Sequence, residues 1–248
     1  MNEIFEIEYI IKYYDVDSSN KASVVSLIEY MQEAATISSE KRGLGREYLQ
    51  ARGEGWILLQ FKARMISLPK LGDKIIVRTW PKKSKGLYLI RQYEVVDENN
   101  NVLCVATSKW IIYSFINKLP VRLNDEILSK YTYSDRSVID DTFNTIKDNG
   151  EYEKIVLDEV LYRDIDTNWH MNNIKYVRDV IESMDNDFLN KYTVDEYIIK
   201  YKHQLVYSNE FDICISKINN QEYMYYLKEK DTDLKDNNCE MYIKWKEK

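Results

Sequence analysis

The stretch RDIDTNWHMNNIKYVRDVIESM, residues 163–184, leads from a polar segment into a helical pattern. Its apolar side chains recur at helical spacing, which predicts a helix over residues 172–184. The chain has only two histidines, and one of them, His170, stands just before this helix beside Asp166 and Asn168. The stretch therefore predicts a helix with a group of polar side chains at its amino end.

A similar pattern occurs earlier, in YDVDSSNKASVVSLIEYM at residues 14–31. Helical spacing again predicts a helix, here over residues 23–42, and Gly43 after it is a stop signal. Alignment of the two stretches places Asp15 opposite Asp164, Asp17 opposite Asp166, Ser19 opposite Asn168, and Lys21 opposite His170. An internal duplication is the simplest explanation. Because only the second copy has the histidine, we expect one working site and one copy that serves as scaffold or pocket.

Each predicted helix is followed by a run of strands with short connections. After the first helix the strand patterns are WILLQFKARMIS, DKIIVRTW, GLYLIRQYEVVD and VLCVATSKWIIYSF. After the second they are YIIKYKHQLVYS, FDICISKI, EYMYYLKEKD and CEMYIKWK. Short connections favour antiparallel sheets, so we expect an α+β chain in which a sheet wraps one long helix, twice over. The first repeat would span residues 1–123 and the second residues 155–248, with a polar linker at residues 124–154.

Composition narrows the class of protein. At 248 residues, 44% of them apolar, the chain has enough material for one large or two ordinary domains. No apolar run reaches about 18 residues and the first residues do not resemble a signal peptide, so we expect a cytoplasmic protein without a membrane span. The net charge of −6 argues against duplex nucleic acid as a partner. The three cysteines, Cys104, Cys214 and Cys239, form no CxxC pair, which argues against a disulfide framework and a structural zinc site.

The polar residues before the second helix have the chemistry needed to hydrolyse an activated acyl group. Asp166, Asn168, His170 and Asn172 stand at every second position, so an extended backbone would put them on one face. The helix N-terminus would stabilise an oxyanion without a metal or cofactor. His170 could take a proton from water while a carboxylate holds its tautomer, and Asn168 could orient the water or donate to the carbonyl oxygen.

The same residues also have plainer explanations. Asp or Asn before a helix is most often a cap, and a lone histidine is more often a structural residue. The spacing D-x-N-x-H could be a fragment of a metal site, although no second histidine stands nearby. The residues alone leave these alternatives open.

The segment resembles the signature of acyl-ACP thioesterases, the plant FatA/FatB type and its bacterial relatives. In that family D-x-N-x-H-x-N-N-x-K-Y opens the long helix of the second repeat, and the matching residues are Asp166, Asn168, His170, Asn172, Asn173, Lys175 and Tyr176. Further similarities follow in the family's order: YMQEAA (30–35), Gly43, GWIL (55–58), LGDKIIVRTWP (71–81), SKWIIY (108–113) and LPVRL (119–123). The resemblance covers most of the chain apart from the linker and the C-terminal strands. It implies a tandem (double) hotdog fold and hydrolysis of the thioester that links a fatty acyl chain to acyl carrier protein.

The resemblance also implies roles for individual residues. His170 with Asp166 would activate water, and Asn168 with the helix N-terminus would polarise the carbonyl group. The first repeat would hold the acyl chain. Candidates for substrate binding are Met31, Gln32, Trp56, Asn172 and Asn173, although the first three are equally well explained as ordinary core.

The sequence departs from the family at one place. Family members carry a glutamate on a strand after the helix, followed in plant members by a cysteine, and here Gln204 and Leu205 stand at these positions. Leu205 removes a cysteine nucleophile at that place. Gln204 can hold a water or a carbonyl but cannot accept a proton as a carboxylate does. Three alternatives stay open: low activity, a base made by His170 with Asp166, or a substitute carboxylate from Glu196 or Glu210.

The implied partner sets a requirement on charge. Acyl carrier proteins are acidic, so a chain of net charge −6 needs a local basic patch for docking, for which the Lys82–Lys85 loop or Lys200, Lys202 and His203 are candidates. Two other functions use the same features: hydrolysis of acyl-CoA, and a hotdog protein that binds acyl chains without cleaving them. A duplicated hotdog can complete in one chain what single-repeat relatives build as dimers, so monomer and homodimer both stay open.

Overall fold

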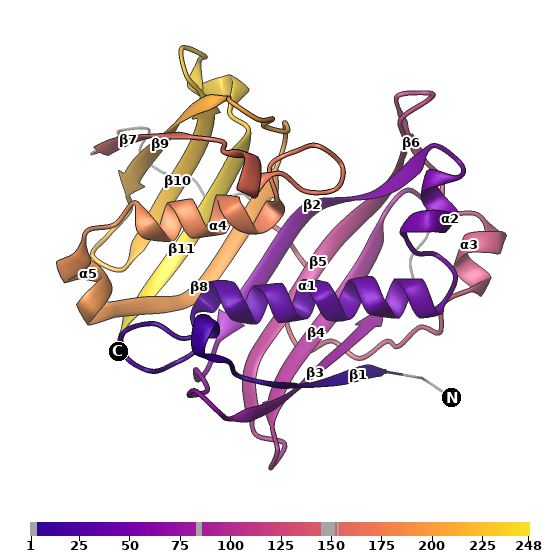
Figure 1. Ribbon diagram of the computed structural model, residues 1–248, viewed down its shortest axis with the longest axis horizontal. Coiled ribbons are helices and arrows are strands. Elements are labelled where there is room, and N and C mark those ends of the chain that lie inside the picture. Colours follow the sequence, from indigo (N-terminus) through magenta and orange to yellow (C-terminus); the bar gives the residue numbers. More distant parts are fainter. Residues whose placement is uncertain (1–3, 83–85, 145–151, 153) are drawn as a thin grey trace. The chain divides into compact units, whose positions relative to one another are not determined.

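The computed structural model describes residues 4–82, 86–144, 152 and 154–248. The chain divides into two compact units, Met1–Thr142 and Phe143–Lys248. In each unit a helix lies across one face of an antiparallel sheet, α1 in the first and α4 in the second (Figure 1). The expected α+β class, with one helix on one sheet in each half, is confirmed.

In the first unit, one strand precedes the long helix in the sequence and the other strands follow it. Its elements are β1 (Phe5–Ile10), the 3-10 helix η1 (Tyr13–Asp15), α1 (Val24–Lys41), α2 (Arg46–Gln50), β2 (Glu54–Met65), β3 (Lys74–Pro81), β4 (Leu89–Asp97), β5 (Val102–Ser114), β6 (Leu119–Val121) and α3 (Asp125–Ser129). The strand order is β1-β3-β4-β5-β2 with antiparallel neighbours, and β6 pairs with the end of β5.

Helix α1 begins and ends where the sequence predicts. Ser23 caps it, because its Oγ accepts a hydrogen bond from the backbone N–H of Ser26 at 3.0 Å. Gly43 follows at φ +66°, a left-handed conformation that glycine adopts without strain. Leu27 and Met31 are completely buried, and burying each such side chain stabilises the fold by about 1.5–3 kcal/mol. The apolar stripe that predicts the helix also attaches it to the sheet.

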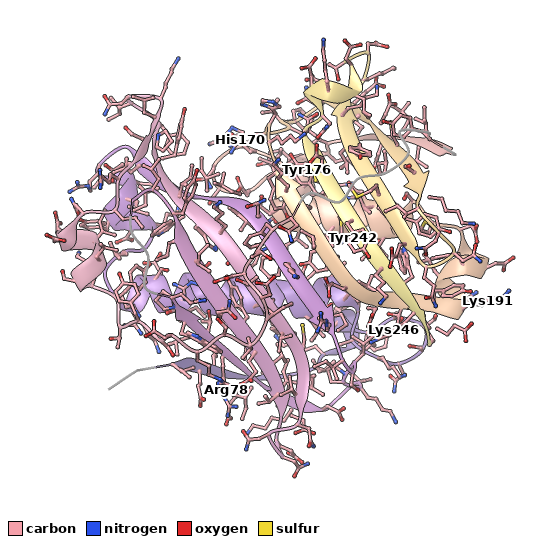
Figure 2. All side chains as sticks on the ribbon, turned by 180° about the vertical axis from the view of Figure 1, so that it is seen from behind. Arg78, His170, Tyr176, Lys191, Tyr242 and Lys246 are labelled. Carbon is pink, nitrogen blue, oxygen red and sulfur yellow. The ribbon has the colours of Figure 1, made fainter. Side chains whose placement is uncertain are left out.

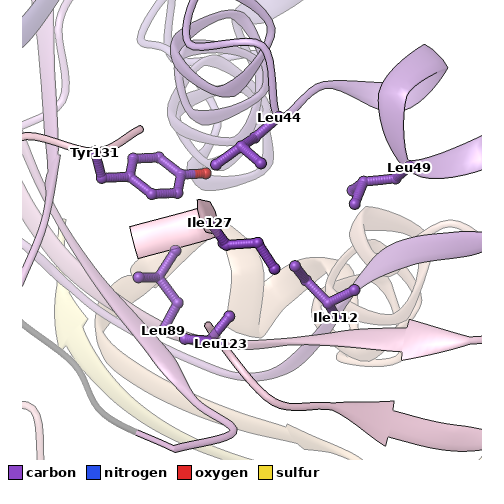
Figure 3. Close-up of a cluster of buried hydrophobic side chains, with 7 residues drawn as sticks. All are labelled: Leu44, Leu49, Leu89, Ile112, Leu123, Ile127 and Tyr131. Carbon is purple, nitrogen blue, oxygen red and sulfur yellow. The ribbon is translucent and has the colours of Figure 1, made fainter. Parts of the chain in front are cut away.

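A second hydrophobic cluster packs against α2 and α3 (Figure 3). Its buried members are Leu44, Leu49, Leu89, Ile112, Leu123, Ile127 and Tyr131. This cluster joins α3 to strands β4 and β5 of the same unit. Residues 124–142, the first part of the segment expected as a linker, therefore belong to the first compact unit.

The chain after α3 stays attached to the first sheet by hydrogen bonds. The indole Nε1 of Trp80 donates to the carbonyl of Arg136 at 3.0 Å. The amide oxygen of Gln92 accepts from the backbone N–H of Val138 at 3.0 Å. A salt bridge of 2.5 Å joins Arg136 to Glu94.

The second unit repeats the first in a shorter form. Its elements are β7 (Lys154–Glu159), η2 (Tyr162–Asp164), α4 (Asn173–Glu182), α5 (Asn186–Lys191), β8 (Tyr192–Tyr201), β9 (Glu210–Lys217), β10 (Glu222–Glu229), η3 (Leu234–Asp236) and β11 (Cys239–Glu247). The strand order β7-β9-β10-β11-β8 reproduces the order of the first unit, strand for strand. The two strand orders support the internal duplication inferred from the sequence.

Some elements differ from the sequence-based expectation. Strands β1, β6 and β7 and the short helices α2, α3 and α5 were not predicted. The strand pattern YIIKYKHQLVYS is too long, because β8 ends at Tyr201 and the backbone of Leu205 bonds to Met171 and Tyr176 instead of a neighbouring strand. Among the residues that the structure describes, no helix combines the length and apolar character needed to span a membrane.

Candidate active site

The segment before α4 is a closed loop. Ile165 and Met171 pair as an isolated antiparallel bridge, and the N–H of Asp166 donates to the carbonyl of His170 at 2.8 Å. Trp169 has φ +66°, which turns the backbone back on itself. The segment is therefore not extended, and the condition under which its polar side chains would share one face is not met. Residues 165–171 are called the histidine loop below.

The carboxylate of Asp166 accepts hydrogen bonds from other residues of this loop. Its Oδ1 accepts from the backbone N–H of Asn168 at 2.7 Å and from that of His170 at 3.3 Å. Its Oδ2 accepts from the side-chain amide of Asn168 at 3.4 Å. These hydrogen bonds go to the backbone and to Asn168, so the carboxylate fixes the position of His170 through the main chain.

One imidazole nitrogen of His170 lacks a hydrogen-bond partner. Its Nδ1 is buried and has no hydrogen-bond partner among the described residues. A buried polar atom without a partner costs free energy and is uncommon in folded proteins. Such an unsatisfied buried atom is one sign of a functional side chain.

Helix α4 directs its amino end toward the histidine loop. Asn172 caps the helix, since its Oδ1 accepts from the N–H of Ile174 at 2.9 Å. The carbonyl of Asn173 accepts from the hydroxyl of Tyr201 at 3.0 Å, which ties the first residue of the helix to the end of β8. The unpaired N–H groups and the dipole of a helix N-terminus favour negative charge at this place.

Gln204 lies on a segment that is fixed to the base of the histidine loop. The next residue, Leu205, is completely buried, its N–H donates to the hydroxyl of Tyr176 at 3.1 Å, and its carbonyl accepts from Met171 at 2.8 Å. The Gln204 side chain is exposed. Figure 2 shows His170 and Tyr176 at the same end of the second unit, whereas Lys191 and Lys246 lie at the other end. The structure thus brings Gln204 beside the loop, although not on a strand.

The carboxylates and cysteines that could replace the family's catalytic groups each have a structural environment of their own. Glu210, at the start of β9, forms an ion pair of 2.6 Å with Lys230, and Glu196 lies in the middle of β8. All three cysteines are free and buried, and burial raises the pKa of the Cys214 thiol and, much further, that of Cys239. These raised pKa values disfavour the thiolate that a cysteine nucleophile requires.

The substrate-binding candidates of the first repeat lie on its helix and sheet. Met31 is buried on α1, Gln32 is half-buried beside it, and Trp56 on β2 donates from Nε1 to the carbonyl of Leu44 at 3.2 Å. Their contact with an acyl chain stays a prediction. Within the described residues, no group of three or more histidine, cysteine or acidic side chains could hold a metal ion.

The basic docking candidates are only partly available. Lys82 forms an ion pair of 2.6 Å with Asp141, and Lys202 pairs with Glu240. Lys200 and His203 are exposed. The rest of the predicted basic loop, residues 83–85, lies outside the described residues.

A buried charge cluster beneath the loop was not found from the sequence. The ammonium of Lys175 lies 2.6 Å from Asp179, 3.2 Å from Asp158 and 3.9 Å from Asp164. Burial would lower the pKa of Lys175, but the carboxylates of Asp179 and Asp158 outweigh it and the pKa is raised. Burial raises the pKa of Asp179 to about 7, with Lys175 opposing and the other carboxylates adding to the rise. The sequence indicates two members of this cluster separately, Lys175 in the matching motif and Asp164 in the internal duplication, but not that they meet.

Both halves of the chain match one protein family. Residues 2–131 match the acyl-ACP thioesterase N-terminal domain, and residues 147–247 match the acyl-ACP thioesterase C-terminal domain. A palmitoyl-acyl carrier protein thioesterase of Gossypium hirsutum is 24% identical over 214 residues, covering 81% of this chain and 52% of the relative. An oleoyl-acyl carrier protein thioesterase of Arabidopsis thaliana is 19% identical over 218 residues, covering 81% and 60%. The chain spans about half the length of the first of these relatives.

Solved structures show the same fold over nearly the whole chain. An acyl-ACP thioesterase from Bacteroides thetaiotaomicron superposes with a TM-score of 0.88 at 18% identity, covering 98% of each chain. A 12:0-ACP thioesterase from Umbellularia californica gives a TM-score of 0.88 at 17% identity, covering 99% of this chain and 98% of the other. The tandem hotdog expected from the sequence is thereby confirmed.

Proposed function

The chain belongs to the acyl-ACP thioesterase family, and from that premise we propose that it hydrolyses the thioester of a fatty acyl chain carried on acyl carrier protein. The observation that carries the proposal is the histidine loop. It holds the buried, unpartnered Nδ1 of His170 next to the amino end of α4. The family match over both halves supports the choice of an acyl carrier protein as the carrier.

The geometry supports a hydrolysis in which the protein supplies a base and an oxyanion site. His170 takes a proton from water, and the water oxygen attacks the thioester carbonyl. The side-chain amide of Asn168 and the amino end of α4 stabilise the negative charge on the carbonyl oxygen. The intermediate then expels the carrier's thiolate, which receives the proton from the imidazolium, and a free fatty acid leaves.

Asp166 and Gln204 have supporting roles in this proposal. Asp166 holds the backbone of Asn168 and His170 in place through two N–H bonds. Gln204 orients the attacking water through its amide, which can both donate and accept. A glutamine cannot take the proton, so the base is His170.

The test is turnover on a panel of acyl carrier proteins loaded with acyl chains of graded length, beside matched acyl-CoA substrates. We expect hydrolysis of at least one acyl-ACP at a higher kcat/KM than the matched acyl-CoA. A higher kcat/KM on the acyl-CoA would assign the protein to the other carrier. Failure to hydrolyse any member of either series would overturn the proposal.

Gln204 favours one second candidate, a protein that binds acyl chains without cleaving them. The departure from the family's glutamate removes the carboxylate that its relatives carry there. We expect the wild type to turn over substrate and Gln204→Glu to change its rate. An inactive wild type that still binds acyl-ACP, together with an active Gln204→Glu variant, would establish the binder instead.

A further inference from the structure

Lys175 connects three elements of the second unit. Its ammonium bonds to Asp179 on α4 at 2.6 Å and to Asp158 on β7 at 3.2 Å, and lies 3.9 Å from Asp164 at the end of η2. The Lys175 side chain is 11% exposed, and those of Asp164 and Asp179 are 6% and 3% exposed. The Lys175 ammonium thus joins three carboxylates, two of them almost fully buried, and the exposed guanidinium of Arg163 also lies 3.9 Å from Asp164.

One of these carboxylates stands at the base of the histidine loop. The carbonyl of Asp164 accepts from the N–H of Asn172 at 2.8 Å, so the two residues that flank the loop are hydrogen-bonded to each other. The Asp164 carboxylate also accepts from the N–H of Leu161 at 3.0 Å. Lys175 stands in the first turn of α4, and its N–H donates to the carbonyl of Asn172 at 2.9 Å. The Lys175 ammonium therefore contacts Asp164 on one side of the loop and acts on Asn172, on the other side, through the hydrogen bond between these two residues.

The first unit builds the same base without a buried cation. Asp15 accepts from the N–H of Lys12 at 2.6 Å, and its carbonyl accepts from Ser23 at 2.7 Å. Ser26 stands in the place of Lys175 and donates to the Asp15 carbonyl at 3.0 Å. Tyr30 stands in the place of Asp179 and donates to the Asp15 carboxylate at 2.6 Å. Neutral hydroxyl groups are thus sufficient to form the loop.

A charged cluster at the same place needs a reason other than folding. Buried ion clusters are often no more stabilising than neutral packing, and one known use of them is to specify a single conformation. The cluster occurs in the copy whose loop carries the imidazole, and the neutral groups occur in the copy with Lys21 at that position. The charge cluster therefore occurs in the same copy as the histidine, and the neutral groups occur in the copy without it.

We propose that Lys175 is a positioning residue that holds the histidine loop, and through it the imidazole of His170, in the arrangement needed for turnover. The inference rests on the proposed function for its catalytic part. It acts through the hydrogen-bonded base formed by Asp164 and Asn172. Lys175 itself does not touch the reacting atoms.

The experiment replaces the charged cluster with the neutral groups of the first copy. The double variant Lys175→Ser/Asp179→Tyr is the main test, because Lys175→Met alone would leave buried carboxylates unpaired and could unfold the protein. Lys175→Arg tests rescue by a residue that keeps the cation. Lys246→Ser is the matched control, since Lys246 also forms a 3.2 Å ion pair with an aspartate, at the other end of the unit (Figure 2).

Two readouts separate positioning from general stability. For the double variant we expect kcat to fall by about tenfold or more with KM within about twofold, because chemistry and not binding loses its geometry. Amide hydrogen exchange in residues 165–171 should rise, while that of strands β10 and β11 stays unchanged. Lys175→Arg should recover part of kcat, and Lys246→Ser should match the wild type in both measurements.

The outcomes are distinguishable from failure of the proposed function. If the wild type hydrolyses acyl-ACP and the double variant retains its kcat, Lys175 does not position the loop. If exchange in the loop is unchanged in the double variant, the inference fails as well. If the wild type lacks hydrolase activity, the proposed function fails, and loop exchange alone then decides whether Lys175 orders the loop.

Discussion

The loops before α1 and α4 have the same backbone and different chemistry. In the first, the N–H of Asp17 donates to the carbonyl of Lys21 at 2.9 Å, as Asp166 does to His170 at 2.8 Å. Asn20 and Trp169 occupy the same turn position, with φ of 61° and 66°. The duplication has therefore preserved the loop at the level of single hydrogen bonds while the side chains on it diverged.

The two loops differ mainly in their own side chains and in the side chains that pack against them from the following helix. The first unit has a hollow of about 310 Å³ there, lined by Lys12, Asp15, Ser26, Glu29, Tyr30 and Glu33. In the second unit Lys175 takes the place of Ser26 and its ammonium lies among carboxylates. A fold can thus keep one copy of a loop as scaffold and equip the other for chemistry with a few substitutions. Paired substitutions in the two loops test this division.

Removal of the imidazole should have the largest effect. We expect His170→Ala to lower kcat by about 10²–10⁴-fold, the range for loss of a general base, with the fold retained. The paired change Lys21→Ala in the first loop should leave kcat unchanged. Steady-state kinetics on acyl-ACP, with circular dichroism to check folding, measures both. Near-wild-type rates for His170→Ala would remove the histidine from the mechanism and the functional contrast between the loops with it.

Changes at Asp166 should have the next largest effect and should depend on the replacement. Because its carboxylate accepts from backbone N–H groups, Asp166→Asn keeps an acceptor oxygen and should cost less than about tenfold in kcat, whereas Asp166→Ala should cost about a hundredfold. Asp17→Ala, in the equivalent position, should lower stability without changing kcat. A loss of about 10⁴-fold in Asp166→Asn would instead mean that the carboxylate holds the imidazole tautomer directly.

These two residues also show how far the sequence could predict the site. Asp166 and His170 were identified as a pair, but their alternation suggested an extended segment, and Trp169 gives no sign of the left-handed turn. The sign is in the other copy, where Asn20 occupies that position and asparagine tolerates positive φ. The charge cluster was missed because its carboxylates come from β7, η2 and α4, and burial of charged residues is not visible in a sequence.

A helix or strand could be predicted wherever its own apolar residues recur with the period of that element. Helices α1 and α4 and eight strands follow from periodicity, whereas β1, β7 and the three-residue β6 were not predicted. Strands β1 and β7 are six-residue edge strands, and each pairs with a strand that lies beyond the intervening helix. The alternating FEIEYI of residues 5–10 was a strand signal, but only its position in the sheet explains why it stays paired.

Asp179 predicts a pH-dependent contribution to the stability of the second unit. Its folded-state pKa of about 7 lies above the ordinary value of 3.8, so between these values the folded chain keeps a proton that the unfolded chain releases. The free energy of unfolding should therefore fall as pH rises from about 4 to 7, by about 2–4 kcal/mol, and then level off. Urea denaturation across this range measures the slope.

The matched variants assign that slope to the cluster. Asp179→Asn keeps an acceptor for Lys175 and cannot ionise, so its stability should vary less with pH than that of the wild type. Tyr30→Phe changes the equivalent position of the first unit, where burial and Asp15 raise the pKa of the phenol, and it should leave the slope unchanged. An equal slope in the wild type and in Asp179→Asn would show that Asp179 is already ionised in the folded state.

The smallest expected effect concerns the tip of the loop. Trp169 is 76% exposed and left-handed, whereas Asn20 holds the same conformation with a side chain suited to it. A left-handed backbone costs most non-glycine residues about 1–2 kcal/mol and asparagine less, and an exposed indole loses little packing when it is removed. Trp169→Asn should therefore stabilise the second unit by up to about 1 kcal/mol, and Asn20→Trp should destabilise the first by a similar amount, both read from urea denaturation. A destabilised Trp169→Asn would mean that the indole contributes packing that its exposure conceals, and the two loop tips would then differ in energetics as well as in sequence.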